Sequence, residues 1–268
     1  LATLVMRMKE NNPDRVIYLA DARQSMHFIQ VFRCARKTGI VPDTTELVHI
    51  GFGTMNGKDG KPFKTRDGGV MRLEYLLKEI DDEMLNKIKE NQKEKENLNI
   101  DEAEAKQTAK TVALAAVKYG DLSNQASKDY IFDIDRFTSF EGNTGPYILY
   151  TIVRIKSILS KYEAKGGNIS ALKDAIMPAV NAGQKNLMLS LAKFNATIES
   201  AYEESAPHKI CAYIYELANA FNGFYHDTKI LSEENEELKK SYISLLVLTK
   251  EILEACIDML GFSAPDRM

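Results

Sequence analysis

The chain lacks the residues on which metal and nucleophile chemistry most often depend. Its 268 residues include no tryptophan, three cysteines and four histidines. Cys34, Cys211 and Cys256 are odd in number and widely spaced in apolar helical contexts, so they predict buried thiols in a reducing compartment, without a disulfide framework. The histidines are also far apart, and no Ser-His-Asp, Cys-His, His-Glu-x-x-His or Cys-x-x-Cys arrangement is present. Nucleophilic catalysis and a protein-bound metal are therefore not expected.

Long apolar runs and an excess of positive charge are lacking as well. No segment reaches the roughly 18 apolar residues of a membrane-spanning helix, and no signal peptide is visible. We therefore expect a cytoplasmic protein with no membrane partner. The net charge of −3 argues against a generally basic nucleic-acid binder and gives no reason to expect DNA. RNA recognition by a local patch remains open.

Residues 1–77 have the pattern of a parallel α/β unit. An apolar strand at 16–20 is followed by helical spacing that stops at Gly39, and a second strand spans 47–52. The expected apolar stripe of the helix comprises Met26, Phe28, Ile29, Phe32, Cys34 and Ala35. Strand–helix–strand over this length predicts a βαβ unit, whose ligands lie at the carboxyl ends of the strands.

A basic, glycine-rich segment follows the second strand. Residues 57–69 hold three lysines, one arginine, four glycines and a proline. Glycine lets backbone amides approach a ligand and the cations suit a polyanion, most plausibly a nucleotide triphosphate, although a solvated hairpin tip has the same composition. The spacing from Gly53 to Lys58 does not fit a Walker-type P-loop. What remains is Lys61 and Lys64, three residues apart, followed by Thr65.

Polar residues also follow the first strand. Asp21 ends the strand, and Gln24 and His27 are three residues apart, so they share one face near the start of a helix. Such a face can hold a polar ligand. The alternative is that Asp21 only caps the helix and His27 is half-buried.

The remainder of the chain is predicted to be helical. Residues 78–140 combine a charged, solvated helix or connector at 81–97 with a helix that Asp101 caps and Gly120 ends. Residues 141–268 contain four long helical patterns, which indicate an α-bundle. These patterns run from Pro146 to about 162, over 169–194 with a break or kink at Pro178, over 208–225, and over 232–260 with an acidic first turn at Glu233 and Glu234.

The first bundle helix carries a group of aromatic and basic residues. Tyr147, Tyr150 and Arg154 are spaced by three and four residues, so they line one side of the helix. Tyrosine and arginine on one face can stack unpaired bases and pair with phosphate, and core tyrosines have the same spacing. A second aromatic and polar cluster spans 221–227, where most aromatic residues are expected to be core.

Taken in order, three motifs resemble the bacterial-type arginyl-tRNA synthetases over essentially the whole chain. They are Asp21-x-x-Gln24-x-x-His27-Phe28, the segment Gly60-Lys-Pro-Phe-Lys-Thr-Arg-Asp-Gly68, and Glu141-Gly-Asn-Thr-Gly-Pro-Tyr147 with Tyr150 and Arg154. The resemblance implies an α/β plus all-α fold. The C-terminal part of a Rossmann-type class I catalytic domain (1–77) would be followed by a helical connector that contacts the tRNA stem (78–140) and a DALR-type anticodon-binding α-bundle (141–268).

The resemblance also implies an activity and a set of site residues. The family activates L-arginine with ATP, accompanied by Mg²⁺, and transfers it to arginine tRNA. The segment at Lys61 and Lys64 looks like a degenerate Lys-Met-Ser-Lys-Ser signature, with Pro62 and Phe63 in place of Met-Ser. The implied residues are Lys61, Lys64 and Thr65 for catalysis; Asp21, Gln24, His27, Gly53 and Arg66 for arginine and ATP; and Tyr147, Tyr150, Arg154, Tyr225 and Met268 for the anticodon loop.

One departure from the family bears on activity. The upstream half of the catalytic domain, with its His-Ile-Gly-His signature, and the family's N-terminal additional domain are absent from the 268 residues. We therefore expect a C-terminal fragment that does not aminoacylate alone and that self-associates through its exposed sheet, whereas the full enzyme is expected to be a monomer. Two other hypotheses are a free-standing RNA-binding module and an unrelated nucleotide-binding α/β protein with a helical appendage.

Overall fold

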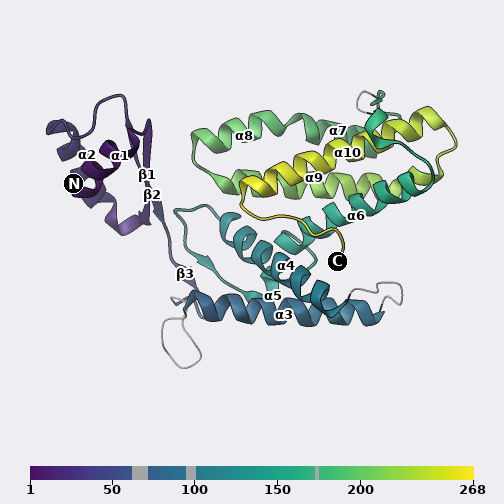
Figure 1. Ribbon diagram of the computed structural model, residues 1–268, viewed down its shortest axis with the longest axis horizontal. Helices are drawn as coiled ribbons and strands as arrows, with labels where there is room; N and C mark the ends of the chain where they lie inside the picture. The colour runs from purple at the N-terminus through teal and green to yellow at the C-terminus, as the bar shows by residue number, and fades with distance from the viewer. Residues whose placement is uncertain (62–71, 95–100, 173–174) are drawn as a thin grey trace. The chain divides into compact units, whose positions relative to one another are not determined.

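The computed structural model describes residues 1–61, 72–94, 101–172 and 175–268, with the side chains of 91–94 excepted (Figure 1). The chain divides into two compact units. The small unit comprises Leu1–Phe63 and Asn124–Phe132, and the helical unit comprises Lys64–Ser123 and Asp133–Met268.

The small unit is built around the predicted strand–helix–strand motif. Its elements are α1 (Ala2–Asn11), β1 (Arg15–Asp21), the 3-10 turn η1 (Ala22–Gln24), α2 (Ser25–Lys37), β2 (Glu46–Phe52), β3 (Met55–Asn56) and β4 (Tyr130–Ile131). β1 and β2 pair in parallel from Arg15↔Glu46 to Asp21↔Phe52, and the short strands β3 and β4 form a second parallel pair. The chain leaves α2 at Gly39 with φ +70°, as the stop signal predicted. The βαβ prediction is therefore confirmed.

Among the described residues, this sheet has a buried core on one side and exposed apolar residues on the other. Leu4, Val16, Ala35 and Val41 are buried together. On the opposite side Ile17 is 47% exposed and Leu19 is 67% exposed. Strands of a parallel sheet are normally covered on both faces, so this side of the small unit is an open apolar face.

The predicted apolar stripe of α2 was too wide. Tyr18 packs against Phe28 and Phe32, with ring centroids 5.0 and 5.7 Å away, and Ala35 completes this buried face. At 100° per residue, Met26, Ile29 and Cys34 lie on other sides of the helix, and all three are exposed. The prediction that all three cysteines are buried is therefore wrong for Cys34. It is confirmed for Cys211 and Cys256, where burial raises the pKa of each thiol to about 12.

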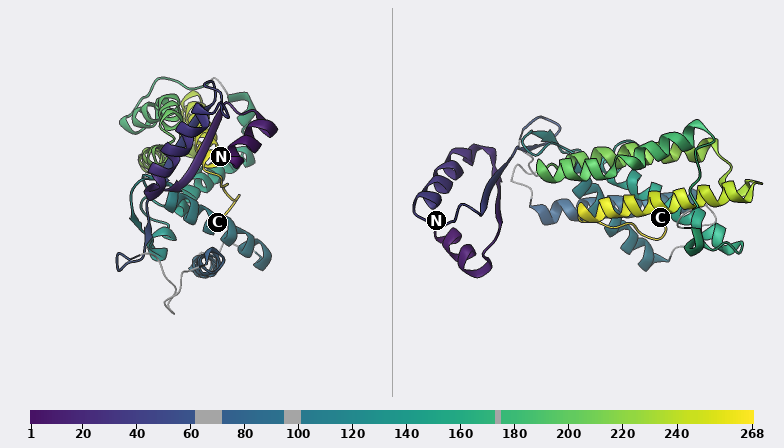
Figure 2. Two further views of the ribbon diagram at one scale, coloured as in Figure 1. Left: turned by 90° about the vertical axis from the view of Figure 1, so that its left-hand side faces the viewer. Right: turned by 90° about the horizontal axis from the view of Figure 1, so that it is seen from above.

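The helical unit contains the longer elements. They are α3 (Leu73–Glu94), α4 (Glu102–Leu122), α5 (Ile134–Phe137), α6 (Gly145–Ala164), η2 (Ile169–Leu172), α7 (Ala182–Ala192), α8 (Phe194–Glu203), α9 (Pro207–Asp227), η3 (Ile230–Ser232) and α10 (Glu236–Met259). α3 packs on α4, which in turn packs on α6. α7 and α8 lie along α9, and α10 lies beside α6 and α9 (Figure 2). The predicted bundle is confirmed.

Three helix starts follow from the capping residues. Asp101 accepts a hydrogen bond from the Glu104 amide, as predicted, and Thr144 caps α6 with Pro146 in its first turn. Asn235 caps α10 by accepting from the amides of Glu237 and Leu238. The acidic first turn of α10 is therefore formed by Glu236 and Glu237, not by Glu233 and Glu234 as predicted.

Two helix predictions were wrong in their extent. Residues 81–94 of the charged stretch belong to α3, which begins at Leu73 and buries Ile80, Met84 and Ile88 against α4, so the helix alternative is confirmed there, with one face buried. The three apolar residues are spaced by four, which is enough for one buried face among many charges. The helical pattern over 169–194 is interrupted around Pro178, as predicted, but its first part is only the short η2. The chain is irregular around Pro178, and α7 begins after Asn181, whose side chain caps it; α8 then follows.

Candidate functional site

The basic segment is described only at its start. Lys61 is exposed, whereas Lys64, Thr65 and Arg66 lie outside the described residues. The Gly60 amide donates to the Gly57 carbonyl over 2.9 Å, and the Gly57 amide donates to the Lys61 carbonyl over 2.8 Å. Gly60 has φ +72°, a conformation that glycine adopts without strain. Lys61 therefore follows a tight turn, which fits both the phosphate-binding and the hairpin-tip interpretation.

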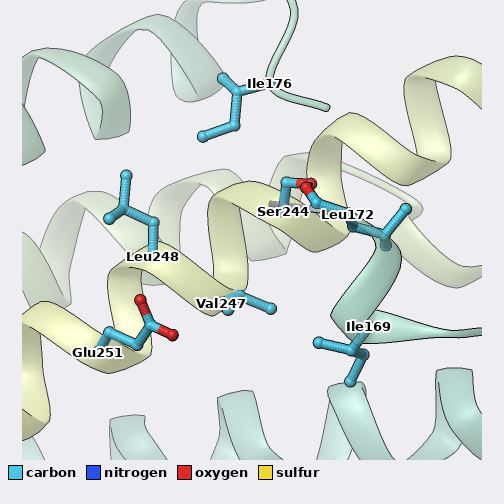
Figure 3. A pocket seen from close by; sticks show the side chains of 7 residues that line it. All are labelled: Ile169, Leu172, Ile176, Ser244, Val247, Leu248 and Glu251. Carbon is cyan, nitrogen blue, oxygen red and sulfur yellow. The ribbon is translucent and has the colours of Figure 1, made fainter. Parts of the chain in front are cut away.

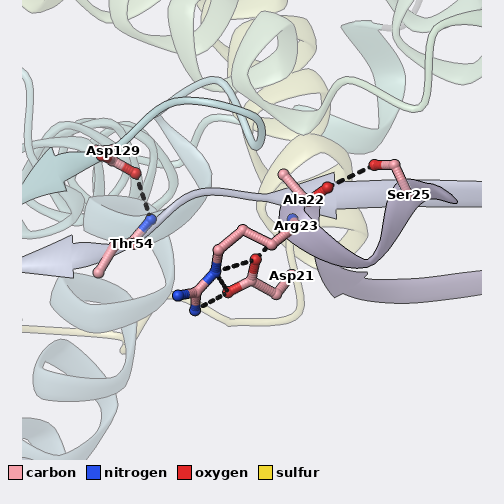
Figure 4. Close-up of polar contacts among 6 residues, drawn as sticks. All are labelled: Asp21, Ala22, Arg23, Ser25, Thr54 and Asp129. Carbon is pink, nitrogen blue, oxygen red and sulfur yellow. Dashed lines mark hydrogen bonds and ion pairs between the residues drawn. The ribbon is translucent and has the colours of Figure 1, made fainter. Parts of the chain in front are cut away.

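Gly53 joins β2 to the segment 124–132 of the same unit. Its amide donates to the Ala126 carbonyl over 2.8 Å, and a Cβ at this position would lie 2.7 Å from the Asp129 amide nitrogen. The Thr54 amide donates to Asp129 Oδ1 over 2.6 Å (Figure 4). In this structure Gly53 therefore has a packing role: it permits close approach of two backbones.

Asp21 lies at the carboxyl end of β1, and its carboxylate is hydrogen-bonded to a neighbouring arginine. Its carboxylate accepts from the Arg23 backbone amide over 2.8 Å and from the Arg23 guanidinium over 2.6 to 3.1 Å (Figure 4). The hydrogen bond from the Arg23 side chain is the main cause that lowers the pKa of Asp21 to about 2. The capping interpretation of Asp21 is confirmed, and sequence reasoning missed Arg23 as its partner.

Gln24 and His27 are both exposed at the start of α2. Gln24 is the residue before the helix and its side chain forms no capping bond there. The His27 ring lies 5.5 Å from the Phe28 ring, and His27 is exposed, not half-buried. Because Asp21 pairs with Phe52, these residues adjoin the carboxyl ends of both β1 and β2. This is the edge at which a parallel sheet binds its ligands.

His49 is a residue that sequence reasoning missed. Its ring stacks on Phe28 at 4.5 Å between centroids, and its Nε2 atom is buried without a hydrogen-bond partner in the structure. A histidine in the middle of an apolar strand was the available signal.

The predicted anticodon residues of α6 and α9 form one cluster. The Arg154 guanidinium carbon lies 4.7 Å from the Tyr150 ring centroid and 5.4 Å from the Tyr225 ring centroid. Both distances are within the range of cation–π interactions. Tyr225 remains 41% exposed, although its ring also stacks on Phe221 at 5.9 Å. We call Tyr147, Tyr150, Arg154 and Tyr225 the aromatic–arginine cluster.

Two asparagines of α9, missed from the sequence, complete the polar side of the cluster. Arg154 Nη1 donates to Asn222 Oδ1 over 2.6 Å, and Asn222 Nδ2 donates to the Tyr147 hydroxyl over 2.9 Å. The Tyr147 hydroxyl donates to Asn219 Oδ1 over 2.6 Å. The sequence predicts an aromatic and polar cluster at 221–227, but it does not indicate a role for the two amides.

The C-terminal tail ends at Met268 and is held near α4 and α6. Arg267 forms two hydrogen bonds of 2.5 and 2.6 Å with the Glu104 carboxylate, and Lys156 lies 3.4 Å from Asp266 Oδ1. Lys118 Nζ donates to the Gly261 carbonyl over 2.5 Å.

A separate cavity of about 350 Å³ contains none of the predicted residues (Figure 3). It is lined by Ile169, Leu172, Ile176, Ser244, Val247, Leu248 and Glu251. The Ser244 hydroxyl already donates to the Leu172 carbonyl over 2.5 Å. Within the described ranges, no three His, Cys, Asp or Glu residues are grouped to hold a metal ion, and no helix is long and apolar enough to cross a membrane.

Two known family models match the two halves of the chain. The family model "tRNA synthetases class I (R), catalytic domain" matches residues 1–134, and the "DALR anticodon binding domain" model matches residues 148–268. Arginine–tRNA ligase of Agathobacter rectalis is 99% identical over the whole chain, which covers 45% of that protein. Arginine–tRNA ligase of Alkaliphilus oremlandii is 54% identical, with 44% of its length covered. The chain thus spans less than half the length of these relatives.

Solved structures have the same fold. The chain superposes on arginyl-tRNA synthetase from Plasmodium falciparum with a TM-score of 0.81 at 28% identity, covering 100% of this chain and 44% of that one. For the Thermus thermophilus arginyl-tRNA synthetase the TM-score is 0.78 at 24% identity, covering 95% and 41%, which supports the fold alone. The hypothesis of an unrelated α/β protein is therefore wrong. The chain belongs to the arginine-type class I tRNA synthetases and carries part of their catalytic domain together with their DALR anticodon-binding domain.

Proposed function

We propose that this chain is the part of an arginine–tRNA ligase that carries the signature loop and recognises the anticodon of arginine tRNA. The observation that carries the proposal is the position of Arg154 against the rings of Tyr150 and Tyr225. Tyr150, Arg154 and Tyr225 lie within the region that matches the DALR family, and Tyr147 immediately precedes it. In the longer protein, L-arginine and ATP would be the other substrates, with Mg²⁺ arriving on ATP, and the protein would act in the cytoplasm.

The aromatic–arginine cluster has the chemistry that single-stranded RNA requires. The exposed Tyr225 ring can stack on an unpaired base, which contributes about 1–3 kcal/mol per base. In the described structure Arg154 donates one N–H to Asn222. Its other N–H groups can donate to phosphate oxygens or base edges. Met268 would meet the same RNA from the tail, through contacts that form only when the RNA is bound.

The proposed catalytic roles rest on the family resemblance. Lys61 and Lys64, with Thr65 and Arg66, would stabilise the negative charge of the triphosphate as the arginine carboxylate attacks the α-phosphate and pyrophosphate leaves. Gln24 would hydrogen-bond the substrate arginine, and His27 would line the adenosine side. Asp21 would shape the turn that presents them, since Arg23 occupies its carboxylate. Gly53 would keep the end of β2 close to residues 124–132.

A binding comparison tests the anticodon assignment. The 268-residue chain is titrated with arginine tRNA and with the same tRNA carrying a substituted anticodon, by filter binding at fixed salt. We expect the substituted tRNA to bind about tenfold more weakly, since roughly one stacking or hydrogen-bonding contact is lost. Arg154→Ala should bind both tRNAs weakly and nearly equally. Equal affinity of the unsubstituted chain for the two tRNAs would contradict the assignment.

The second candidate function is a free-standing RNA-binding module without catalysis. The helical unit has its own extensive core, whereas the small unit leaves Ile17 and Leu19 exposed, and this contrast favours RNA binding as the activity of the isolated chain. A coding sequence that continues upstream into a His-Ile-Gly-His motif would favour the enzyme. An authentic start codon immediately before Leu1 would favour the module.

We also propose that the isolated chain self-associates through the open apolar face. Ile17 pairs with Val48 and Leu19 with Ile50, so four large apolar side chains share that face. Leu19→Lys should shift the chain toward monomer by roughly tenfold in association constant, because it places a charge in an apolar contact. Sedimentation equilibrium measures this. Leu189→Lys, at a 57% exposed position on α7, is the matched control and should have no effect. Equal behaviour of the two variants would contradict the proposal.

A further inference from the structure

We infer that Asn222 is the residue that positions Arg154 and Tyr147 for RNA, an inference that rests on the proposed anticodon function. Asn222 is half-buried on α9, opposite the side of α6 that carries both residues. Its amide contacts three side chains of α6. It accepts from Arg154 over 2.6 Å and donates to the hydroxyls of Tyr147 over 2.9 Å and Thr151 over 3.4 Å.

The direction of these hydrogen bonds follows from Arg154. A guanidinium can only donate, so the oxygen of the Asn222 amide must face it. The amide nitrogen of Asn222 then faces the Tyr147 oxygen, which acts as acceptor. The single Tyr147 proton is left for Asn219 Oδ1. The result is a chain of donors and acceptors from Arg154 through Asn222 and Tyr147 to Asn219, in which each partner fixes the next.

This chain determines what the cluster can offer to RNA. The Tyr147 hydroxyl is engaged at both its proton and its oxygen, so its ring is the part that remains for contact with a base. Arg154 is held by one hydrogen bond and by the rings of Tyr150 and Tyr225, so its other N–H groups keep a fixed direction. A guanidinium that is oriented before binding loses less conformational freedom when RNA arrives. Asn222 thus contributes to binding without being required to touch the RNA.

Two aspartate substitutions distinguish the positioning role of Asn222 from the repulsion of RNA by an added negative charge. Asn222→Asp keeps an acceptor for Arg154 but removes the donor to Tyr147, whose oxygen then faces a second acceptor. Asn219→Asp adds the same negative charge one helical turn away and keeps the acceptor that Tyr147 needs. We expect Asn222→Asp to weaken arginine tRNA binding at least about tenfold and to bring the ratio between original and substituted anticodons close to one. Asn219→Asp should lose less than about threefold and keep that ratio.

The measurement is filter binding of both tRNAs to the full 268-residue chain and its two variants, with a thermal melt of each protein to confirm folding. Equal losses in the two aspartate variants would show charge repulsion and overturn the inference. A folded Asn222→Asp variant that still discriminates between the anticodons would also overturn it while leaving the proposed function intact. Failure of the unsubstituted chain to discriminate would instead overturn the proposed function, and the inference with it.

Discussion

The 268-residue chain, assayed alone, is expected to give no arginine-dependent exchange of pyrophosphate into ATP. Among the described residues, the main sheet of its small unit pairs β1 with β2, and one side of these strands is an open apolar face. A nucleotide crevice in such a fold forms where neighbouring loops meet beyond the carboxyl ends of several strands. Gln24 and His27 are exposed at that edge.

The expected loss of activity is large because an incomplete nucleotide crevice neither orients the substrates nor stabilises the charge that develops in the transition state. Each of these contributes several kcal/mol to an enzyme's rate enhancement, so exchange should fall at least about 10³-fold below that of the longer enzyme. The assay compares the chain with the longer arginine–tRNA ligase from Agathobacter rectalis, each with and without arginine tRNA. Exchange by the chain at a rate similar to that of the longer enzyme would contradict the expectation.

Gly145→Ala is expected to destabilise the helical unit by about 3 kcal/mol. Gly145 is the first residue of α6 and packs against the backbone of α4. A Cβ at this position would lie 2.6 Å from the Ala115 carbonyl carbon and 3.0 Å from the Ala116 amide nitrogen. Both atoms belong to helix backbone, so relief requires α4 and α6 to separate, and side-chain rotation cannot provide it.

Gly223→Ala is the matched control within α9. Nothing in the described structure lies within 4 Å of a Cβ at this exposed position, so the substitution should stabilise the helix by about 0.5–1 kcal/mol. Circular dichroism at 222 nm during thermal unfolding follows both variants, because most of the helix belongs to this unit. At about 2–4 °C per kcal/mol, Gly145→Ala should lower Tm by roughly 6–12 °C. A change below about 2 °C would contradict close packing of α4 on α6.

The fold was predictable where a single local signal determined the structure. Asp101 and Pro146 marked helix starts correctly, and Gly39 marked a helix end, because capping and left-handed conformations depend on one or two residues. The extent of helices was less predictable. The apolar residues of 169–194 have helical spacing, but Pro178 and the cap at Asn181 divide them. Burial on α2 was overestimated since the spacing of Met26 and Ile29 does not reveal which sides of the helix have partners.

The candidate site was predictable in its residue types but not in its hydrogen bonds. The spacing of Tyr147, Tyr150 and Arg154 placed them together on α6, and the family resemblance had implied Tyr225, whose ring the structure places beside Arg154 from α9. Asn222 and Asn219 were missed because an amide in a helix has no distinctive spacing, and its role depends on a partner about 70 residues away. The engagement of Asp21 by Arg23 was missed for a different reason, since a cap and a ligand carboxylate look alike in sequence.

The attachment of the tail to α4 also decides where this protein can be divided for expression. Glu104 lies in the region that matches the catalytic family, yet it holds Arg267 of the region that matches the DALR family. The buried Tyr119 of the same helix reaches the Cys211 carbonyl of α9 over 2.9 Å. A recombinant anticodon-binding piece that began at residue 148 would lose α4 and leave these partners uncovered. To remain soluble, an expressed anticodon-binding fragment should therefore begin before α3, so that α3 and α4 are kept with the bundle.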